Sequence, residues 1–381
     1  MSDEPIPLAR PQVGAREEEE LLEALRSRRL SLGPRLAHFE AALGRYLGCS
    51  HVSAVSSGTA ALHLCVRAAG VAAGDEVLTT PFSFVSSANC LLYEGATPVF
   101  CDIDPSTLNM DPDAAAAAVT DRTSGLLPVH IFGYPADLPA FERLALQRGL
   151  WIVEDACEAL GAVHADGTAV GARGHLATFG FYPNKQLTTG EGGAVISPSA
   201  ELKERIDSER NQGRSPDMGW LDHDRLGFNY RLSDLACALG LAQLERLGET
   251  IDARARIAAL YEEALADVEG LALPCRDSGG NRRSWFVYVV QLPSGVDRDA
   301  AIRALRARGV DSKPYLPAIH LLSFYRERFG HREGEFPVCE DVSRRSLALP
   351  FFPELTASQV ERVAMGLAEV LETARSTQQP G

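Results

Sequence analysis

The sequence predicts an α/β protein: a large domain with a mostly parallel sheet flanked by helices, followed by a smaller C-terminal α+β domain. Its 381 residues are too many for one small core. Short apolar runs alternate with helical stretches up to about residue 232, as in βαβ units. A long amphipathic helical stretch then leads into sequence with one clear strand pattern. We therefore expect a large domain at 1–245, including the N-terminal helices, and a small domain at 246–381.

The large domain begins with two expected helices in residues 15–47, separated by a break at "SLGP". Apolar runs then predict strands and intervening amphipathic runs predict helices. The expected strands are 51–57, 75–81, 97–104, 123–132, 150–156, 176–182, 192–198 and, in the small domain, 284–292. The expected helices are 56–70, 83–95, 111–120, 137–149, 199–210, 232–265 with a break near Gly248, 297–309 and 356–375.

Composition excludes several classes of protein. Asp and Glu number 51 against 37 Lys and Arg, for a net charge of -14, which argues against nucleic-acid or anionic-membrane binding. No apolar run approaches the roughly 18 residues of a membrane span, and no secretory signal is visible, so we expect a cytoplasmic protein. The eight cysteines and nine histidines show no metal-ligand spacing, so we expect reduced thiols and no metal site.

Lysine is rare in this chain, so each position that keeps one is a candidate for a role that arginine could not fill. Only Lys185, Lys203 and Lys313 occur among the 37 basic residues. Unlike arginine, lysine can lose its proton and act as an amine nucleophile. Lys203 lies in a polar helical stretch, and the proline after Lys313 suggests a loop. Lys185 lies in "TFGFYPNKQLTTGEGGAV", between aromatic and glycine-rich sequence, which is not typical of an exposed charged face.

Three further features fall after the expected carboxyl ends of strands, where open α/β sheets bind ligands. Gly58 and Thr59, in "SSGTAALHL", open a helix whose N–H groups could bind a phosphate, or the turn could simply cap the helix. Asp155 ends the apolar run "WIVED", where a buried carboxylate is costly unless paired, or it could cap a loop. Phe84 stands at another strand-to-helix junction, where it could instead simply pack in the core.

Together these features fit pyridoxal 5′-phosphate. This cofactor needs a lysine for a Schiff base and a carboxylate that keeps its ring nitrogen protonated, so that the ring is a strong electron sink. It also needs a phosphate site and a flat side chain to stack on its ring. Lys185, Asp155, the Gly58–Thr59 turn and Phe84 supply one group for each requirement.

In its motifs the sequence resembles the DegT/DnrJ/StrS family of sugar aminotransferases, which have the type I fold of pyridoxal phosphate enzymes. The resemblance covers nearly the whole chain, through "LSLGPRLAHFEAALGRYLG", "SSGTAALHL", "GDEVLTTPFSFVSSANCLLYEGATPVFCDID", "PVHIFGYPADL", "VEDACEALGA", "FYPNKQLTTGEGGAV" and "GFNYRLSDLACALGLAQLERL". It implies roles for six residues: the Schiff-base lysine, the ring-nitrogen partner, the stacking aromatic, two phosphate ligands and a phosphate ligand from the other subunit. These are, in that order, Lys185, Asp155, Phe84, Gly58 with Thr59, and Asn229.

The role of Asn229 implies a homodimer with shared active sites. Two positions depart from the family pattern. Glu158 stands where the family usually has Gln touching the cofactor's ring oxygen, so the tuning of the Schiff base is expected to differ. Gly180 replaces a serine that binds the phosphate, with Thr178 or water as candidates to take its place.

The resemblance implies transfer of an amino group from L-glutamate to a keto sugar, a nucleotide-linked 4-keto-6-deoxy sugar, in amino-sugar biosynthesis. Lys185 would shuttle the proton. His320 matches a region near the sugar site, but it could equally serve packing. Three different functions also stay open: a cyclitol (inosose-type) aminotransferase, a pyridoxal phosphate-dependent sugar dehydratase and a non-catalytic regulatory homologue. Dehydratases that resemble this sequence carry His at the position of Lys185, which disfavours a dehydratase.

Overall fold

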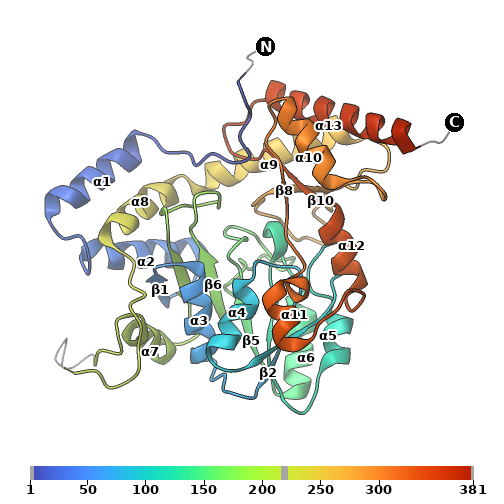
Figure 1. The fold of residues 1–381 in the computed structure, drawn as a ribbon. Coiled ribbons are helices and arrows are strands. Elements are labelled where there is room, and N and C mark those ends of the chain that lie inside the picture. Colours follow the sequence, from blue (N-terminus) through green and yellow to red (C-terminus); the bar gives the residue numbers. More distant parts are fainter. Residues whose placement is uncertain (1–3, 216–221, 379–381) are drawn as a thin grey trace.

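The computed structural model describes residues 4–215 and 222–378, and its larger sheet has seven strands in the order β1-β7-β6-β5-β4-β2-β3 (Figure 1). Strand β7 pairs antiparallel with β6 and β1, while the pairs from β6 through β5, β4 and β2 to β3 are parallel. The strands are β1 Val52–Val55, β2 Glu76–Thr79, β3 Thr97–Phe100, β4 Thr123–Leu127, β5 Trp151–Asp155, β6 Leu176–Gly180 and β7 Gly193–Ile196.

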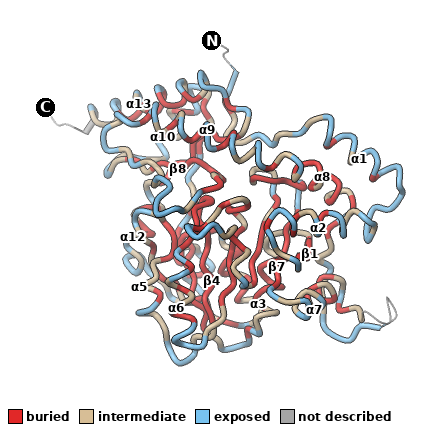
Figure 2. Tube along the Cα trace, turned by 180° about the vertical axis from the view of Figure 1, so that it is seen from behind, coloured by how far each residue is buried: buried red, intermediate tan, exposed pale blue. Residues whose placement is uncertain are grey.

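Both faces of this sheet are buried. Successive side chains of a strand point to opposite sides, so each strand supplies apolar side chains to both faces. On β5, Val153 joins one apolar cluster and Ile152 joins another. On β2, Val77 and Leu78 divide between the same two clusters. This explains why the strands read as continuous apolar runs in the sequence, and why the sheet forms the red interior of Figure 2.

Helices cover the two faces of the sheet. One cluster packs α3 against the sheet, the second packs α2 and α8 against β1, β6 and β7, and the third packs α5 and α6 against β2, β4 and β5. The helices that join or flank these strands are α1 Ala15–Ser27, α2 Pro34–Leu47, α3 Gly58–Ala68, α4 Ser86–Tyr93, α5 Pro112–Ala118, α6 Leu138–Arg148, α7 Ala200–Arg210 and α8 Asp234–Glu245, with the 3₁₀ turn η1 Ile131–Gly133.

The C-terminal part has a separate antiparallel sheet, in the order β8-β10-β9, with its own apolar cluster. Figure 1 shows α10 and α13 beside this sheet, above the large sheet. Its elements, with two helices that pack below it, are α9 Leu247–Leu265, β8 Tyr288–Gln291, α10 Arg298–Ala307, β9 Lys313–Pro314, η2 Ile319–Leu321, α11 Ser323–Phe329, α12 Pro337–Arg345, β10 Ser346–Leu349 and α13 Ala357–Gln378.

The first described residues pack on this C-terminal part. Ile6 is fully buried in its apolar cluster and pairs with Val310 in an isolated β-bridge. The Leu8 carbonyl accepts a hydrogen bond from the Phe351 N–H at 2.9 Å. The N-terminal segment therefore packs against the C-terminal part, and Figure 1 shows the N-terminus above it, while the C-terminus lies at the far end of α13.

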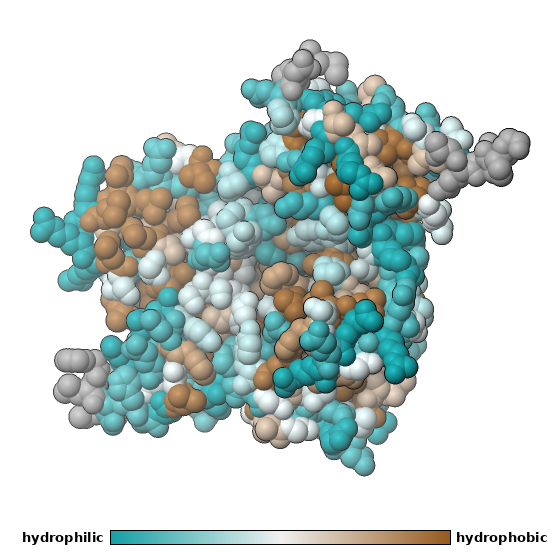
Figure 3. Space-filling view, viewed as in Figure 1, coloured by the Kyte–Doolittle hydropathy of each residue, from teal (hydrophilic) through white to brown (hydrophobic). Residues whose placement is uncertain are grey.

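Helix α1 and the segment after it expose apolar side chains. Leu22, Leu25, Leu30 and Leu32 are between 46% and 55% exposed. Figure 3 shows brown surface gathered over this side of the molecule, where α1 projects from the body. No helix in the described ranges combines the length and the hydropathy needed to cross a membrane.

The predicted α/β fold with its mostly parallel sheet is confirmed. The predicted break near Gly248 lies two residues earlier, at Arg246, between the end of α8 at Glu245 and the start of α9 at Leu247. Lys313 was expected in a loop but lies in β9, paired with Ala348 of β10. The sequence also did not predict β10, α11 or α12. The division into 1–245 and 246–381 stays a proposal.

Candidate functional site

Lys185 lies in the loop between β6 and β7, which form an antiparallel pair closed by Gly180 opposite Gly193. The Phe181 N–H donates to the Gly192 carbonyl at 2.9 Å, and the Thr189 N–H donates to the Phe181 carbonyl at 3.0 Å. Because Phe181 is fully buried, these bonds fix the base of the loop to the sheet. The unusual lysine of the sequence is thus held on a rigid support.

The Lys185 amine lies between an acid and an aromatic ring. Its Nζ is 3.6 Å from Glu158 Oε1 and 3.7 Å from the centroid of the Phe286 ring, and its side chain is 14% exposed. Glu158 contacts the amine as an ion-pair partner, and Phe286 contacts it through the face of its ring. The amine is therefore held in one place and still reaches solvent.

Asp155 ends β5 and is 4% exposed. Its Oδ2 accepts a hydrogen bond from the Ser87 hydroxyl at 2.6 Å, and its Oδ1 accepts one from the Cys157 N–H at 3.1 Å. None of the described cationic side chains forms an ion pair with it. A buried carboxylate normally has such a partner, and among the described residues Asp155 has two hydrogen-bond donors in its place.

Glu158 is 6% exposed and interacts with the chain through both of its oxygens. Oε2 accepts a hydrogen bond from the Phe132 N–H at 2.9 Å, and Oε1 faces Lys185. Burial raises the pKa of the Glu158 carboxyl above its ordinary value of 4.5, while the nearby Lys185 opposes this rise. The structure thus places two predicted site residues, Glu158 and Lys185, in direct contact.

Gly58 allows the N-terminus of α3 to approach β6 closely. A Cβ at Gly58 would lie 2.9 Å from Cys157 Sγ and 3.4 Å from Gly180 Cα. The Cys157 thiol therefore fills the space between the turn and the strand, where the missing serine at Gly180 was expected. Thr178, a candidate to replace that serine, is fully buried and its hydroxyl is 3.4 Å from the Glu154 carbonyl, inside the sheet.

Thr59 follows Gly58 in the same turn, in the first turn of α3. The Ser57 hydroxyl caps α3 by accepting from the Ala60 N–H at 3.0 Å, so a capping role holds for Ser57. Ser57 and Thr59 line an open hollow of about 370 Å³, together with Ser56, Ala60, His63, Tyr93 and Tyr230. Asn229, next to Tyr230, is exposed and pairs with Asn211 in an isolated bridge.

Phe84 and His320 differ sharply in exposure. Phe84 is 61% exposed, so core packing does not explain its ring, and its carbonyl accepts from the N–H of Ser87, the residue that binds Asp155. His320 is fully buried, with its ring against Phe336 and its Nε2 3.1 Å from Glu340 Oε1. This is the packing arrangement that the sequence left open, and the substrate role of His320 stays a prediction.

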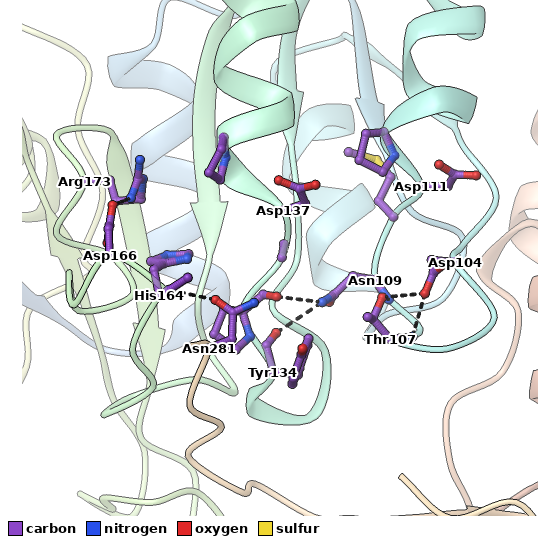
Figure 4. A pocket seen from close by; sticks show the side chains of 16 residues that line it. Asp104, Thr107, Asn109, Asp111, Tyr134, Asp137, His164, Asp166, Arg173 and Asn281 are labelled. Carbon is purple, nitrogen blue, oxygen red and sulfur yellow. Dashed lines mark hydrogen bonds and ion pairs between the residues drawn. The ribbon is translucent and has the colours of Figure 1, made fainter. Parts of the chain in front are cut away.

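Another hollow, of about 490 Å³, lies at the carboxyl ends of β3, β4 and β5 (Figure 4). Four aspartates line it, and each already binds the local backbone: Asp104 accepts from the Thr107 N–H at 2.7 Å, and Asp137 caps α6 through the Ala140 N–H at 3.1 Å. Asp111 and Asp166 accept from backbone N–H groups two residues ahead. These acids stabilise turns and helix starts, as Figure 4 shows for Asp104.

Sequence reasoning missed three residues that organise the site. Ser87 orients Asp155, Phe286 lies under the Lys185 amine, and Arg254 binds the Lys185 carbonyl at 3.2 Å. Ser87 follows a strand, like the other site residues, and this signal could have found it. Phe286 and Arg254 lie 101 and 69 residues from Lys185 in the sequence and carry no local signal.

The chain is similar to known proteins over nearly its whole length. The DegT/DnrJ/EryC1/StrS aminotransferase family matches residues 11–368. GDP-perosamine synthase of Caulobacter vibrioides is 35% identical, over 97% of this chain and 100% of that protein. DesV of S. venezuelae, solved in complex with a ketimine intermediate, is 35% identical with a TM-score of 0.88, over 93% and 94% of the two chains. DesI, solved in the presence of its TDP-sugar product, is 33% identical with a TM-score of 0.89, over 99% and 95%.

Proposed function

Because the chain belongs to the DegT/DnrJ/EryC1/StrS aminotransferase family, we propose that it uses pyridoxal 5′-phosphate to move an amino group from L-glutamate to a nucleotide-linked keto sugar. One observation carries the proposal: the Lys185 amine lies 3.6 Å from Glu158, and Asp155, three residues before Glu158, is buried with no cationic partner among the described residues. The relatives support the substrate class, since one is a GDP-perosamine synthase and another was solved with a TDP-sugar product.

The residues of the site fit the cofactor. Asp155 would pair with the protonated ring nitrogen, which is the cation that the buried carboxylate lacks. The Gly58–Thr59 turn would offer N–H groups at the positive end of α3 to the phosphate. Phe84 has an exposed ring that could cover a face of the cofactor, and Lys185 would hold it through its amine. Bound there, pyridoxal phosphate would supply an electron sink for the carbon that loses a proton.

The chain's own residues would do three things in the reaction. Ser87 and the Cys157 N–H keep the Asp155 carboxylate in one orientation, so that it holds a proton at the cofactor's ring. The Lys185 amine would take a proton from the donor's α-carbon and return it, as a general base and acid. Glu158, itself fixed by the Phe132 N–H, would hold the free Lys185 amine in place, since Glu158 Oε1 and Lys185 Nζ lie 3.6 Å apart.

We also propose that two copies of the chain form a homodimer with shared sites. Asn229 is exposed beside the turn that begins α3, so its side chain is open to a neighbouring molecule. Apolar side chains gather on α1 and the following segment (Figure 3), and exposed apolar patches often mark protein interfaces. Sedimentation of the purified protein tests this, and a monomer at micromolar concentration would contradict it.

The first test is the visible absorbance of the protein supplied with pyridoxal phosphate, before and after L-glutamate is added. We expect a visible band that falls as the pyridoxamine form appears. Lys185→Ala should abolish both the band and turnover, whereas the matched control Lys313→Ala should keep them, because Lys313 is exposed in β9. A band that L-glutamate leaves unchanged would overturn the proposed donor, and a full band with turnover in Lys185→Ala would overturn the role of the lysine.

A further inference from the structure

Arg254, on α9, is a buried arginine with no acidic partner among the residues that the structure describes. It is 3% exposed, and no carboxylate in the described part of the chain forms an ion pair with it. Burial alone lowers the pKa of its guanidinium, to about 10, so the group is charged at neutral pH. Buried Arg210 shows the usual arrangement, with Glu40 at 2.5 Å and Asp207 at 2.7 Å. Arg254 therefore requires a different explanation.

The guanidinium of Arg254 binds four main-chain carbonyls. Its Nη2 donates to Asn184 and Lys185, both at 3.2 Å. Its Nη1 donates to Phe286 at 2.9 Å and to Trp285 at 3.4 Å. The first pair belongs to the β6–β7 loop and the second to the segment just before β8, so one planar side chain joins two segments about 100 residues apart.

The two segments that Arg254 joins also contact each other through Lys185 and Phe286. Lys185 supplies the amine, and Phe286 supplies the ring whose centroid lies 3.7 Å from it. The segment also contains Trp285, which has a φ of 53°, a left-handed conformation that a bulky residue seldom adopts without support. The Arg254 bonds to the carbonyls of Trp285 and Phe286 provide such support.

We infer that Arg254 is a positioning residue for Lys185: by joining the Lys185 loop to Trp285–Phe286, it fixes where the lysine amine lies relative to Phe286 and Glu158. The inference rests on the proposed role of Lys185. A flexible four-carbon side chain reaches a reproducible point only if its backbone is fixed. A shift of about 1 Å in such a group can cost on the order of a hundredfold in rate.

The first measurement uses the cofactor-free protein. The three lysines allow limited reductive methylation to be followed peptide by peptide, with exposed Lys313 as the internal reference. We expect the labelling ratio of Lys185 to Lys313 to rise severalfold in Arg254→Lys, because an ammonium cannot bridge four carbonyls as a planar guanidinium does. Arg210→Lys, the matched control, should leave the ratio unchanged.

The second measurement uses the protein loaded with pyridoxal phosphate. In Arg254→Lys and Arg254→Gln we expect the pH midpoint of the visible band to shift and the half-reaction with L-glutamate to slow by roughly tenfold or more. Arg210→Lys should lower the unfolding temperature without moving the midpoint. If both Arg254 variants fold but keep the wild-type labelling ratio, midpoint and rate, the residue is structural only and the inference is overturned.

A further variant keeps the test decisive if neither Arg254 variant folds. Trp285→Gly retains the guanidinium but loosens the segment that the guanidinium holds. The pH midpoint and the labelling ratio should therefore shift in the same direction as in the Arg254 variants. Unchanged values in Trp285→Gly would overturn the inference. The proposed function fails separately, namely if the wild-type protein gives no visible band that depends on Lys185.

Discussion

Two groups of acidic side chains lie at the carboxyl ends of strands in the same sheet, and they are used differently. Asp104, Asp111, Asp137 and Asp166 surround the hollow of Figure 4 and accept hydrogen bonds from the backbone next to them. Asp155 and Glu158 are 4% and 6% exposed and face a serine and a lysine from distant segments. The acids around the hollow of Figure 4 thus stabilise local turns, while Asp155 and Glu158 are nearly enclosed.

This difference shows that position at the edge of a sheet does not by itself identify a reactive site. Acids that cap turns and helices stay partly solvated, so a bound cation would stabilise them little further. A buried carboxylate without a cation carries a desolvation cost, which a bound cation would offset. Substitutions in the two regions should therefore affect different properties of the protein.

The largest expected effect is that of Asp155→Asn. The amide would keep the shape and the Ser87 contact but lose the charge that holds a proton on the cofactor's ring. We expect the half-reaction with L-glutamate to slow by about a hundredfold or more, as when other preorganised electrostatic groups are removed. Stopped-flow absorbance measures it. A rate in Asp155→Asn equal to that of Asp137→Asn would remove the distinction between the two regions.

A smaller effect is expected for Asp137→Ala, on stability and not on rate. Loss of the cap on α6 should lower the free energy of unfolding by about 1 kcal/mol. Urea unfolding measures this change, and the same sample serves for the half-reaction. If the rate fell together with stability, the hollow of Figure 4 would belong to the reacting site after all.

The smallest expected effect is a change of stability with pH in Glu158→Gln. Burial raises the pKa of Glu158 in the folded chain above 4.5, so the contribution of this acid is fully present below pH 4.5. That contribution is lost as pH rises through the folded pKa. Relative to Glu158→Gln, the wild type should therefore become less stable as pH rises above 4.5. Urea unfolding of the cofactor-free protein at several pH values tests this sign, and a constant difference would contradict it.

Much of the fold and part of the site could be predicted from the sequence. Strands buried on both faces read as apolar runs, and the turns after them place Asp155, Lys185 and Gly58 where the structure has them. Two classes of feature could not be predicted. Strand β10 has four buried residues, preceded by two arginines and followed by a proline, without a periodic pattern. Arg254 acts on backbone carbonyls far along the chain, and any sequence supplies carbonyls, so no residue type marks its partners.

The burial of Ile6 has a consequence for how the protein is made. The Ile6 N–H donates to the Gly309 carbonyl at 2.8 Å, and the Asp311 N–H donates to the Ile6 carbonyl at 3.0 Å. This segment leaves the ribosome some 300 residues before its partners do. The apolar side chain of Ile6 must therefore stay exposed while the large sheet folds. Ile6 can be buried only after residues 309–311 have been made, and a chain that stops before them would leave this segment accessible to chaperones and proteases.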